Sequence, residues 1–92
     1  MLTVIAYDIA DDRRRDAVST MLADHGQRVN YSVFECELDR PAFETLRAQL
    51  SKTIKAGEDR VLFYRLCEEC RTRASTLGRS SNDHGHSGVV II

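Results

Sequence analysis

Three short segments of this 92-residue chain are typical of β-strands and carry apolar side chains on both faces. They are residues 2–9, 28–38 and 60–66, and β-branched and aromatic residues dominate each of them. A sheet with one face in water alternates apolar and polar residues along its strands, and these segments do not. Two helices can cover only one side of so small a sheet, so the other face needs a second cover. A symmetric dimer is the simplest solution, and the alternative is a C-terminal tail folded back over the sheet.

Two amphipathic helices are predicted between the strands. The first begins near Asp11, which suits an N-cap, and ends at Gly26, placed as a left-handed C-cap. The second begins near Asp39, has Pro41 in its first turn, and ends at Gly57. The residues alone therefore predict the order β-α-β-α-β.

We expect one domain over residues 1–78 and a flexible arm over residues 79–92. Residues 67–77 are compatible with one more short helix, and residues 78–88 are glycine-rich and polar. The chain then ends in four β-forming residues, 89–92. We expect these four to pair as an edge strand, preferably on a second protomer.

Composition indicates a soluble cytoplasmic protein without membrane contact. No run approaches the roughly 20 apolar residues of a membrane span. The N-terminal segment reaches an acidic residue at Asp8 and lacks the basic start and small-residue cleavage site of a signal peptide. Three cysteines, an odd number, favour a reducing compartment with free thiols. The net charge of -1 excludes a general polycation.

Asp8 is the first candidate functional residue. It ends an apolar strand and, by the two-residue period of a strand, shares a face with Leu2, Val4 and Ala6. That face packs either against a second protomer or against the helices. A carboxylate there needs a cation, a metal ion or hydrogen-bond donors. The alternative is that Asp8 merely caps the turn into the first helix.

Arginines follow Asp8 closely. Arg13 to Arg15 lie in the first turn of the predicted helix, where cations oppose the helix dipole. Phosphate contact would explain them, although a solvated helix face is the usual role of such a run. Arg28, Arg60 and Arg65 flank or lie within strands, where they form either a basic rim for nucleic acid or ion pairs with nearby acids.

The cysteines and histidines suggest a metal or redox site only weakly. Cys67 and Cys70 have the spacing of zinc ligands, but a single residue separates His84 from His86, fewer than zinc sites use. A redox pair at these cysteines would lack the βαβ context of thioredoxin-like proteins. Cys36 lies within a strand and is expected to be a small buried apolar side chain.

Several separated strings, in the correct order, resemble the Cas-two family of CRISPR-associated proteins. The strings are Tyr7-Asp8-Ile9, residues 11–15, Gly26 with Arg28, Tyr31-Ser32-Val33-Phe34, and residues 58–66 (EDRVLFYRL). The resemblance covers roughly residues 2–66. It implies a ferredoxin-like βαββαβ-type α+β domain whose antiparallel sheet carries two helices on one face. It also implies a homodimer through the other face.

The resemblance further implies a nuclease site. In that family the first-strand aspartates of two protomers hold one divalent ion, usually magnesium, which makes Asp8 the catalytic residue and Mg²⁺ ligand. The family includes endonucleases acting on single-stranded RNA or double-stranded DNA, and its members also bridge the Cas-one integrase and spacer DNA. Nucleic-acid contact is implied for Arg14, Arg15 and Arg28, and a supporting role for Tyr7, Ser32 and Phe34.

Three function classes therefore compete. The first is a metal-dependent nuclease of the spacer-acquisition module, and the second is a non-catalytic dimeric scaffold for the integrase and DNA. The third is an unrelated ferredoxin-like regulator or RNA-recognition module. Residues 60–66 lack the glycine-aromatic pattern of an RNA-recognition motif, which counts against the third class. The sequence does not separate the first two.

Overall fold

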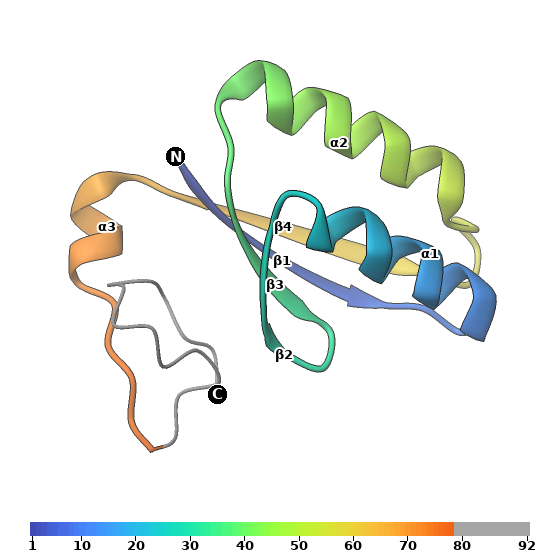
Figure 1. Cartoon of the computed structure of the whole chain (residues 1–92), viewed down its shortest axis with the longest axis horizontal. Helices are drawn as coiled ribbons and strands as arrows, with labels where there is room; N and C mark the ends of the chain where they lie inside the picture. The colour runs from blue at the N-terminus through green and yellow to red at the C-terminus, as the bar shows by residue number, and fades with distance from the viewer. Residues whose placement is uncertain (79–92) are drawn as a thin grey trace.

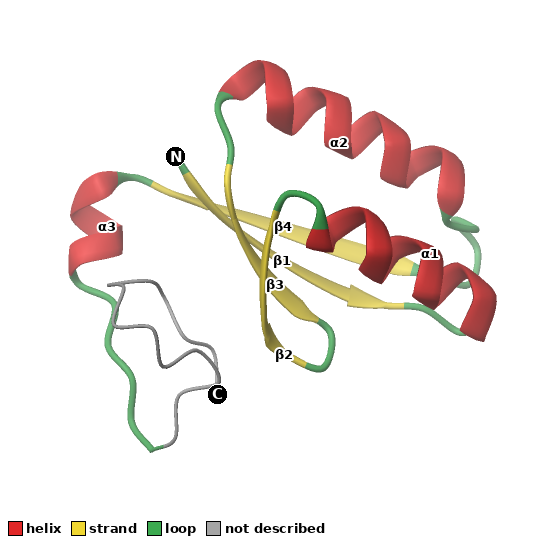
Figure 2. Ribbon diagram, viewed as in Figure 1, coloured by secondary structure: helices red, strands yellow, loops and turns green. Residues whose placement is uncertain are grey.

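The computed structural model describes residues 1–78. The elements are β1 (Leu2–Asp8), α1 (Asp12–Ala23), β2 (Gly26–Asn30), β3 (Val33–Glu37), α2 (Arg40–Thr53), β4 (Arg60–Leu66) and α3 (Glu68–Thr72). The strands form one antiparallel sheet in the order β2-β3-β1-β4, with β1 and β3 in the middle (Figures 1 and 2). The expected α+β fold of βαββαβ type is confirmed. The strand expected at residues 89–92 lies outside the described residues.

The main core lies between the sheet and two helices, α1 and α2. Ile5 and Tyr7 of β1 and Ile9 just after it belong to this core, together with apolar residues of both helices. Asp11 and Asp39 cap the two helices as expected, because their side chains accept hydrogen bonds from backbone N–H groups of the first turns. None of the helices among residues 1–78 is long and apolar enough to cross a membrane.

The single strand expected over residues 28–38 is wrong. A turn at Tyr31 and Ser32 divides this segment into the hairpin strands β2 and β3. Gly26 is not the helix C-cap either, since α1 ends at Ala23 and Gly26 is the first residue of β2. A Cβ atom on Gly26 would lie 2.0 Å from the backbone oxygen of Glu35. Glycine is therefore required at this position by the close approach of two strands.

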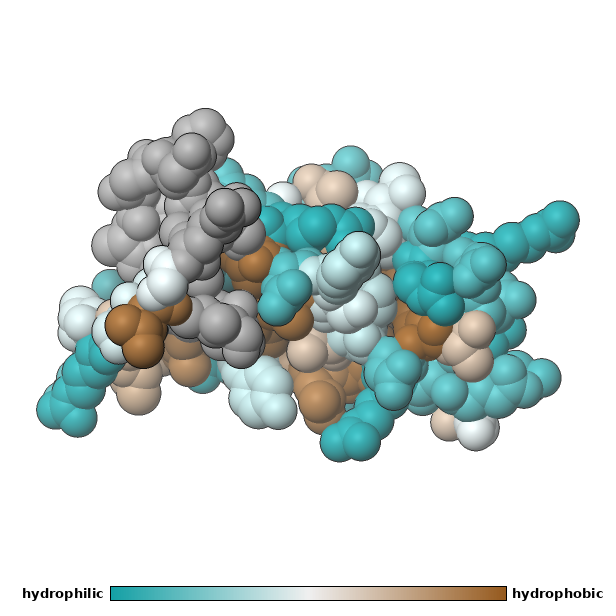
Figure 3. Space-filling model, turned by 90° about the horizontal axis from the view of Figure 1, so that it is seen from below, coloured by the Kyte–Doolittle hydropathy of each residue, from teal (hydrophilic) through white to brown (hydrophobic). Residues whose placement is uncertain are grey.

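The second face of the sheet carries a smaller apolar cluster. Leu2 and Val4 are each 4% exposed and pack with partly buried Val33, Leu66 and Ala74. Ala74 follows α3, so the segment after β4 covers one end of this face. The face without α1 and α2 is called the open face below. Seen from below, the molecule shows patches of apolar surface between hydrophilic regions (Figure 3).

Candidate functional site

Asp8 is the last residue of β1 and lies on the open face. Its neighbour in the sheet is Arg60, the first residue of β4, and the two are directly paired across the strands. Both line a pocket of about 200 Å³ together with Ala6, Tyr7 and Leu62. Within residues 1–78, neither the Asp8 nor the Arg60 side chain takes part in a hydrogen bond or an ion pair. The carboxylate and the guanidinium are therefore both available to a ligand.

The hairpin turn between β2 and β3 lies against the end of β1. The Tyr7 backbone N–H donates to the Ser32 carbonyl oxygen at 3.0 Å. The Tyr7 hydroxyl donates to the Tyr31 carbonyl oxygen at 3.4 Å, and the Tyr7 ring stacks on Phe34 with centroids 6.3 Å apart. The structure thus brings Tyr7, Ser32 and Phe34 together next to Asp8. Ser32 takes part through its backbone carbonyl.

Arg28 joins this group from β2. Its guanidinium donates to the Tyr31 carbonyl oxygen and to the Ser19 hydroxyl, and it lies 5.0 Å from the centroid of the Phe34 ring. All of these partners are uncharged, so no carboxylate among residues 1–78 neutralises Arg28 by an ion pair. Arg60 lies beside Asp8 on the open face, and Arg28 contacts Ser19 of α1 on the other face. Both are positive groups that can attract phosphate.

Arg14 is in a different environment, because two carboxylates hold its guanidinium. Its Nε donates to Asp59 Oδ2 at 2.7 Å, and its Nη2 donates to Asp59 Oδ1 and to Glu58 Oε1, each at 3.2 Å. The Asp59 side chain is fully buried. The hydrogen bond from Arg14 holds the pKa of Asp59 far below its usual range, aided by backbone N–H donors from Lys55 and Ala10 and opposed by desolvation. The same bond raises the pKa of Arg14.

Arg15 binds the backbone that follows Asp8. Its Nε and Nη2 donate to the Ile9 carbonyl oxygen at 3.3 and 3.0 Å. Its Nη1 donates at 2.6 Å to Asp12, whose side chain is 89% exposed. The N-cap of α1 is Asp11, so the alternative interpretation of Asp8 as the helix cap finds no supporting contact.

The sequence assigns no specific role to two residues of this site. Arg60 is predicted only as part of a basic rim or of an ion pair, although antiparallel pairing of the first and last strands places it opposite Asp8. Asp59 lies within the string of residues 58–66 that resembles the family, but the sequence gives it no function. Its partners Ala10 and Arg14 are 49 and 45 residues away in the chain, and no local pattern reveals such contacts.

The three cysteines lie apart from this site. Cys67 caps α3 by accepting a hydrogen bond from the Cys70 backbone N–H, and this bond lowers the pKa of the Cys67 thiol. Cys36 is fully buried, and desolvation, with the nearby charge of Glu35, raises its pKa to about 11. The described residues contain no group of three or more His, Cys, Asp or Glu side chains able to hold a metal. His84 and His86 lie outside the described residues.

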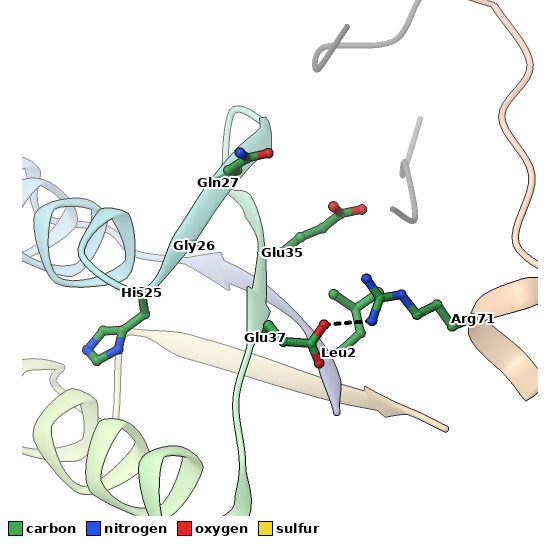
Figure 4. A pocket seen from close by; sticks show the side chains of 7 residues that line it. All are labelled: Leu2, His25, Gly26, Gln27, Glu35, Glu37 and Arg71. Atoms are coloured by element: carbon green, nitrogen blue, oxygen red, sulfur yellow. Dashed lines mark hydrogen bonds and ion pairs between the residues drawn. The ribbon is translucent and has the colours of Figure 1, made fainter. Parts of the chain in front are cut away.

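A second pocket, of about 210 Å³, lies on the open face between the hairpin and α3 (Figure 4). Arg71 of α3 donates to Glu37 of β3 at 2.6 Å across it. The hydrogen bond from the N-terminal amine is the largest cause that holds the pKa of Glu37 below its usual range; desolvation opposes it, and Arg71 lowers the pKa further. None of the residues predicted from the sequence to form the functional site lines this pocket. The bond between Arg71 and Glu37 anchors α3 to the sheet.

Comparison with known proteins identifies the family of this chain. The model of the family described as CRISPR associated protein Cas2 matches residues 1–74. The chain belongs to the Cas2 family. A protein of Chloroflexus aurantiacus named CRISPR-associated endoribonuclease Cas2 is 46% identical over the full length of both chains. A Thermus thermophilus protein named CRISPR-associated endonuclease Cas2 is 41% identical, over 68% of this chain and 70% of its own.

The fold comparison agrees with the sequence comparison. The crystal structure of Streptococcus pyogenes Cas2 matches with a TM-score of 0.75 and 31% identity. The match covers 85% of this chain and all of the Streptococcus chain. The arrangement of sheet and helices described above is therefore that of Cas2 proteins.

Proposed function

We propose that this protein is a metal-dependent endonuclease that hydrolyses phosphodiester bonds of single-stranded RNA or double-stranded DNA, with Asp8 as its catalytic residue. The observation that carries the proposal is the exposed Asp8 carboxylate, which has no protein partner within residues 1–78 and lies beside Arg60 in a pocket. The names of the relatives, endoribonuclease and endonuclease, support the same class of reaction.

The donor set fits a magnesium ion if two protomers contribute to it. One chain offers the carboxylate of Asp8 and, among the described residues, no cluster of three ligands. Magnesium keeps several waters and needs only one or two carboxylates, so Asp8 from each protomer of a homodimer suffices. A bound Mg²⁺ ion would supply charge that stabilises the scissile phosphate and would lower the pKa of the attacking water.

The protein's own groups have two tasks in this proposal. The paired Asp8 carboxylates hold the cation, which in turn offsets the repulsion between them. Arg60 binds a phosphate beside Asp8, and Arg28 binds a phosphate farther along the nucleic acid, since no ion pair among residues 1–78 engages either. Arg15 can contact phosphate by exchanging its exposed partner Asp12. Phosphate contact by Arg14 stays a prediction that requires release of Glu58, its exposed partner.

The biological setting that we propose follows from family membership. The protein acts in the cytoplasm in the CRISPR adaptation module, as a homodimer together with the Cas-one integrase. A second candidate function is the non-catalytic scaffold that bridges this integrase and spacer DNA. Arg28 and Arg60, which no ion pair among residues 1–78 engages, support this candidate as well, because holding duplex DNA needs phosphate contacts and no metal.

Asp8→Asn tests the proposal against a matched control, Asp16→Asn, which removes an exposed acid from α1. Loss of the metal ligand removes several kcal/mol of transition-state stabilisation, so we expect magnesium-dependent cleavage to fall at least about 100-fold. Folding, followed by circular dichroism, should be unchanged, and the control should cleave normally. Full cleavage by Asp8→Asn would place the activity elsewhere. A wild-type protein that neither cleaves nor binds metal, yet joins integrase to duplex DNA, would favour the scaffold.

A further inference from the structure

The peptide group between Ile9 and Ala10, one residue after Asp8, is hydrogen-bonded at both its carbonyl oxygen and its N–H. The carbonyl oxygen of Ile9 accepts two hydrogen bonds from Arg15, at 3.0 and 3.3 Å. The N–H of Ala10, in the same peptide group, donates to Asp59 Oδ1 at 3.1 Å. The two protein groups come from different elements, α1 and the loop before β4. This pair of contacts is called the Ile9–Ala10 clamp below.

The residue before Asp8 is fixed as well. Tyr7 donates its backbone N–H to Ser32 in the hairpin turn. The Asp8 carboxylate itself has no partner among residues 1–78, so its direction depends on the backbone that carries it. Ligating carboxylates are usually oriented by hydrogen bonds to their own oxygens. Without such hydrogen bonds, the direction of the Asp8 carboxylate depends on the groups that hold the neighbouring peptide groups in place.

The contacts of Asp59 indicate that it fixes the relative positions of three segments of the chain. Its buried carboxylate accepts from Ala10, from Lys55 at 2.8 Å and twice from Arg14, so it joins the α2–β4 loop, the β1–α1 loop and α1. A buried ion pair is weak evidence for stability, because apolar residues of similar volume often stabilise a fold as much. Several directed bonds from three segments do, however, fix positions that apolar packing would leave adjustable.

We propose that Asp59 and Arg15 are positioning residues for Asp8, which act through the Ile9–Ala10 clamp to aim its carboxylate at the divalent ion. This inference rests on the proposed metal-dependent function. It gives Arg15 a role distinct from phosphate contact. A phosphate contact contributes to the salt dependence of nucleic-acid binding, whereas a clamp contributes to the metal requirement.

The test uses Asp59→Ala and Arg15→Gln, with Glu58→Ala as the matched control. Glu58 is the neighbouring acid and binds the same Arg14, but it does not touch the clamp. The first readout is hydrogen exchange of the Ala10 amide by NMR, without metal or nucleic acid. The second is the Mg²⁺ concentration that gives half-maximal cleavage, and the third is the salt dependence of nucleic-acid binding.

We expect Ala10 to exchange at least about 10-fold faster in Asp59→Ala, because the amide loses its acceptor. The Mg²⁺ requirement should rise about 10- to 100-fold in Asp59→Ala and Arg15→Gln, the usual cost of losing an outer partner of a metal ligand. The salt dependence of binding separates the two roles of Arg15, since loss of a phosphate contact would reduce it and loss of the clamp would not. Glu58→Ala should match the wild type in Ala10 exchange and in the Mg²⁺ requirement, the two measurements that report on the clamp.

Three results would overturn the inference. The first is an unchanged Ala10 exchange rate in Asp59→Ala, and the second is faster exchange with an unchanged Mg²⁺ requirement. The third is an Arg15→Gln variant that alters salt dependence alone, as a phosphate contact would. If Asp59→Ala does not fold, Arg15→Gln carries the test, since its side chain is partly exposed. A wild type without metal-dependent cleavage refutes the proposed function, and Ala10 exchange then decides the clamp by itself.

Discussion

The two faces of the sheet differ in how much of their apolar surface is covered by other parts of the same chain. On the face toward α1 and α2, Ile5, Leu22 and Leu46 are fully buried, and the protein supplies the whole cover. On the open face, Leu2 and Val4 are buried, but Tyr64, which pairs with Val4, is 54% exposed. Asp8, at the other end of β1, is also exposed. The first face accounts for folding, and the second leaves groups available for recognition.

This difference also explains why the strands tolerate no slip in register. Successive residues of β1 alternate between the faces, so a shift by one residue would exchange them. Asp8 would then enter the apolar core, and Tyr7 would lose its contact with Phe34. The position of the candidate site is therefore fixed by the same pairing that builds the core.

The largest expected effect on the free energy of unfolding is at the covered face. Leu46→Ala removes a fully buried side chain and should lower this free energy by about 3 kcal/mol, measured by urea denaturation. Leu62→Ala, on the open face, should cost less than about 1.5 kcal/mol at protein concentrations where the chain is monomeric. Equal losses would show that both faces belong to one core.

The next effect concerns assembly through the open face. If two protomers meet there, Tyr64→Asp places a charge in the interface and should weaken dimerisation about 100-fold, roughly 2.7 kcal/mol. Light scattering over a range of micromolar concentrations measures it. Thr45→Asp, on the exposed side of α2, is the control and should leave assembly unchanged. A monomeric wild type would remove the dimer from the proposal.

A smaller effect is expected for nucleic-acid binding. Arg60→Gln should weaken binding and reduce its salt slope by about one unit, because one phosphate contact is lost. Arg47→Gln is the matched control, since Arg47 is an equally exposed arginine on α2, away from Asp8. Binding measured at several salt concentrations distinguishes the two. Equal slopes in both variants would mean that Arg60 contributes only general positive charge.

The smallest effect that we predict appears only in acid. The pKa of Asp59 is lowered in the folded protein, so its ionised form stabilises the fold above the ordinary carboxyl pKa of about 3.9. This contribution is lost as pH falls from there toward the lower folded pKa. Asp59→Ala should therefore lose less thermal stability than the wild type between pH 5 and pH 2. An identical pH profile would contradict the shift.

Most of the fold could be predicted from the sequence because its signals are local. Runs of β-branched and aromatic residues locate β1 and β4, and a helical pattern locates α2. The capping residues Asp11 and Asp39 mark where two helices begin. The hairpin turn at Tyr31 and Ser32 could not be located from the residues alone. It contains no glycine, and no non-glycine residue among 1–78 has a positive φ, so the usual turn signal is missing.

The candidate site could be predicted only in part, for a related reason. Asp8, Tyr7 and Phe34 lie in strings that identify the family, and the structure brings them together. The difference between Arg14, bound by carboxylates, and Arg60, bound by none among residues 1–78, depends on which loops meet. Contacts between residues more than 40 positions apart leave no periodic trace in a sequence.

The position of β1 in the sheet has a consequence for synthesis of the protein. β1 is made before the other elements of residues 1–78, yet it pairs with β3 on one side and with β4 on the other. The ribosome therefore releases this apolar strand before either of its partner strands has been made. The sheet cannot be completed until residue 66 has emerged, so folding must follow translation of nearly the whole domain. During that interval the nascent chain is exposed to aggregation, and a chaperone that shields its N-terminal segment would raise the yield of folded protein.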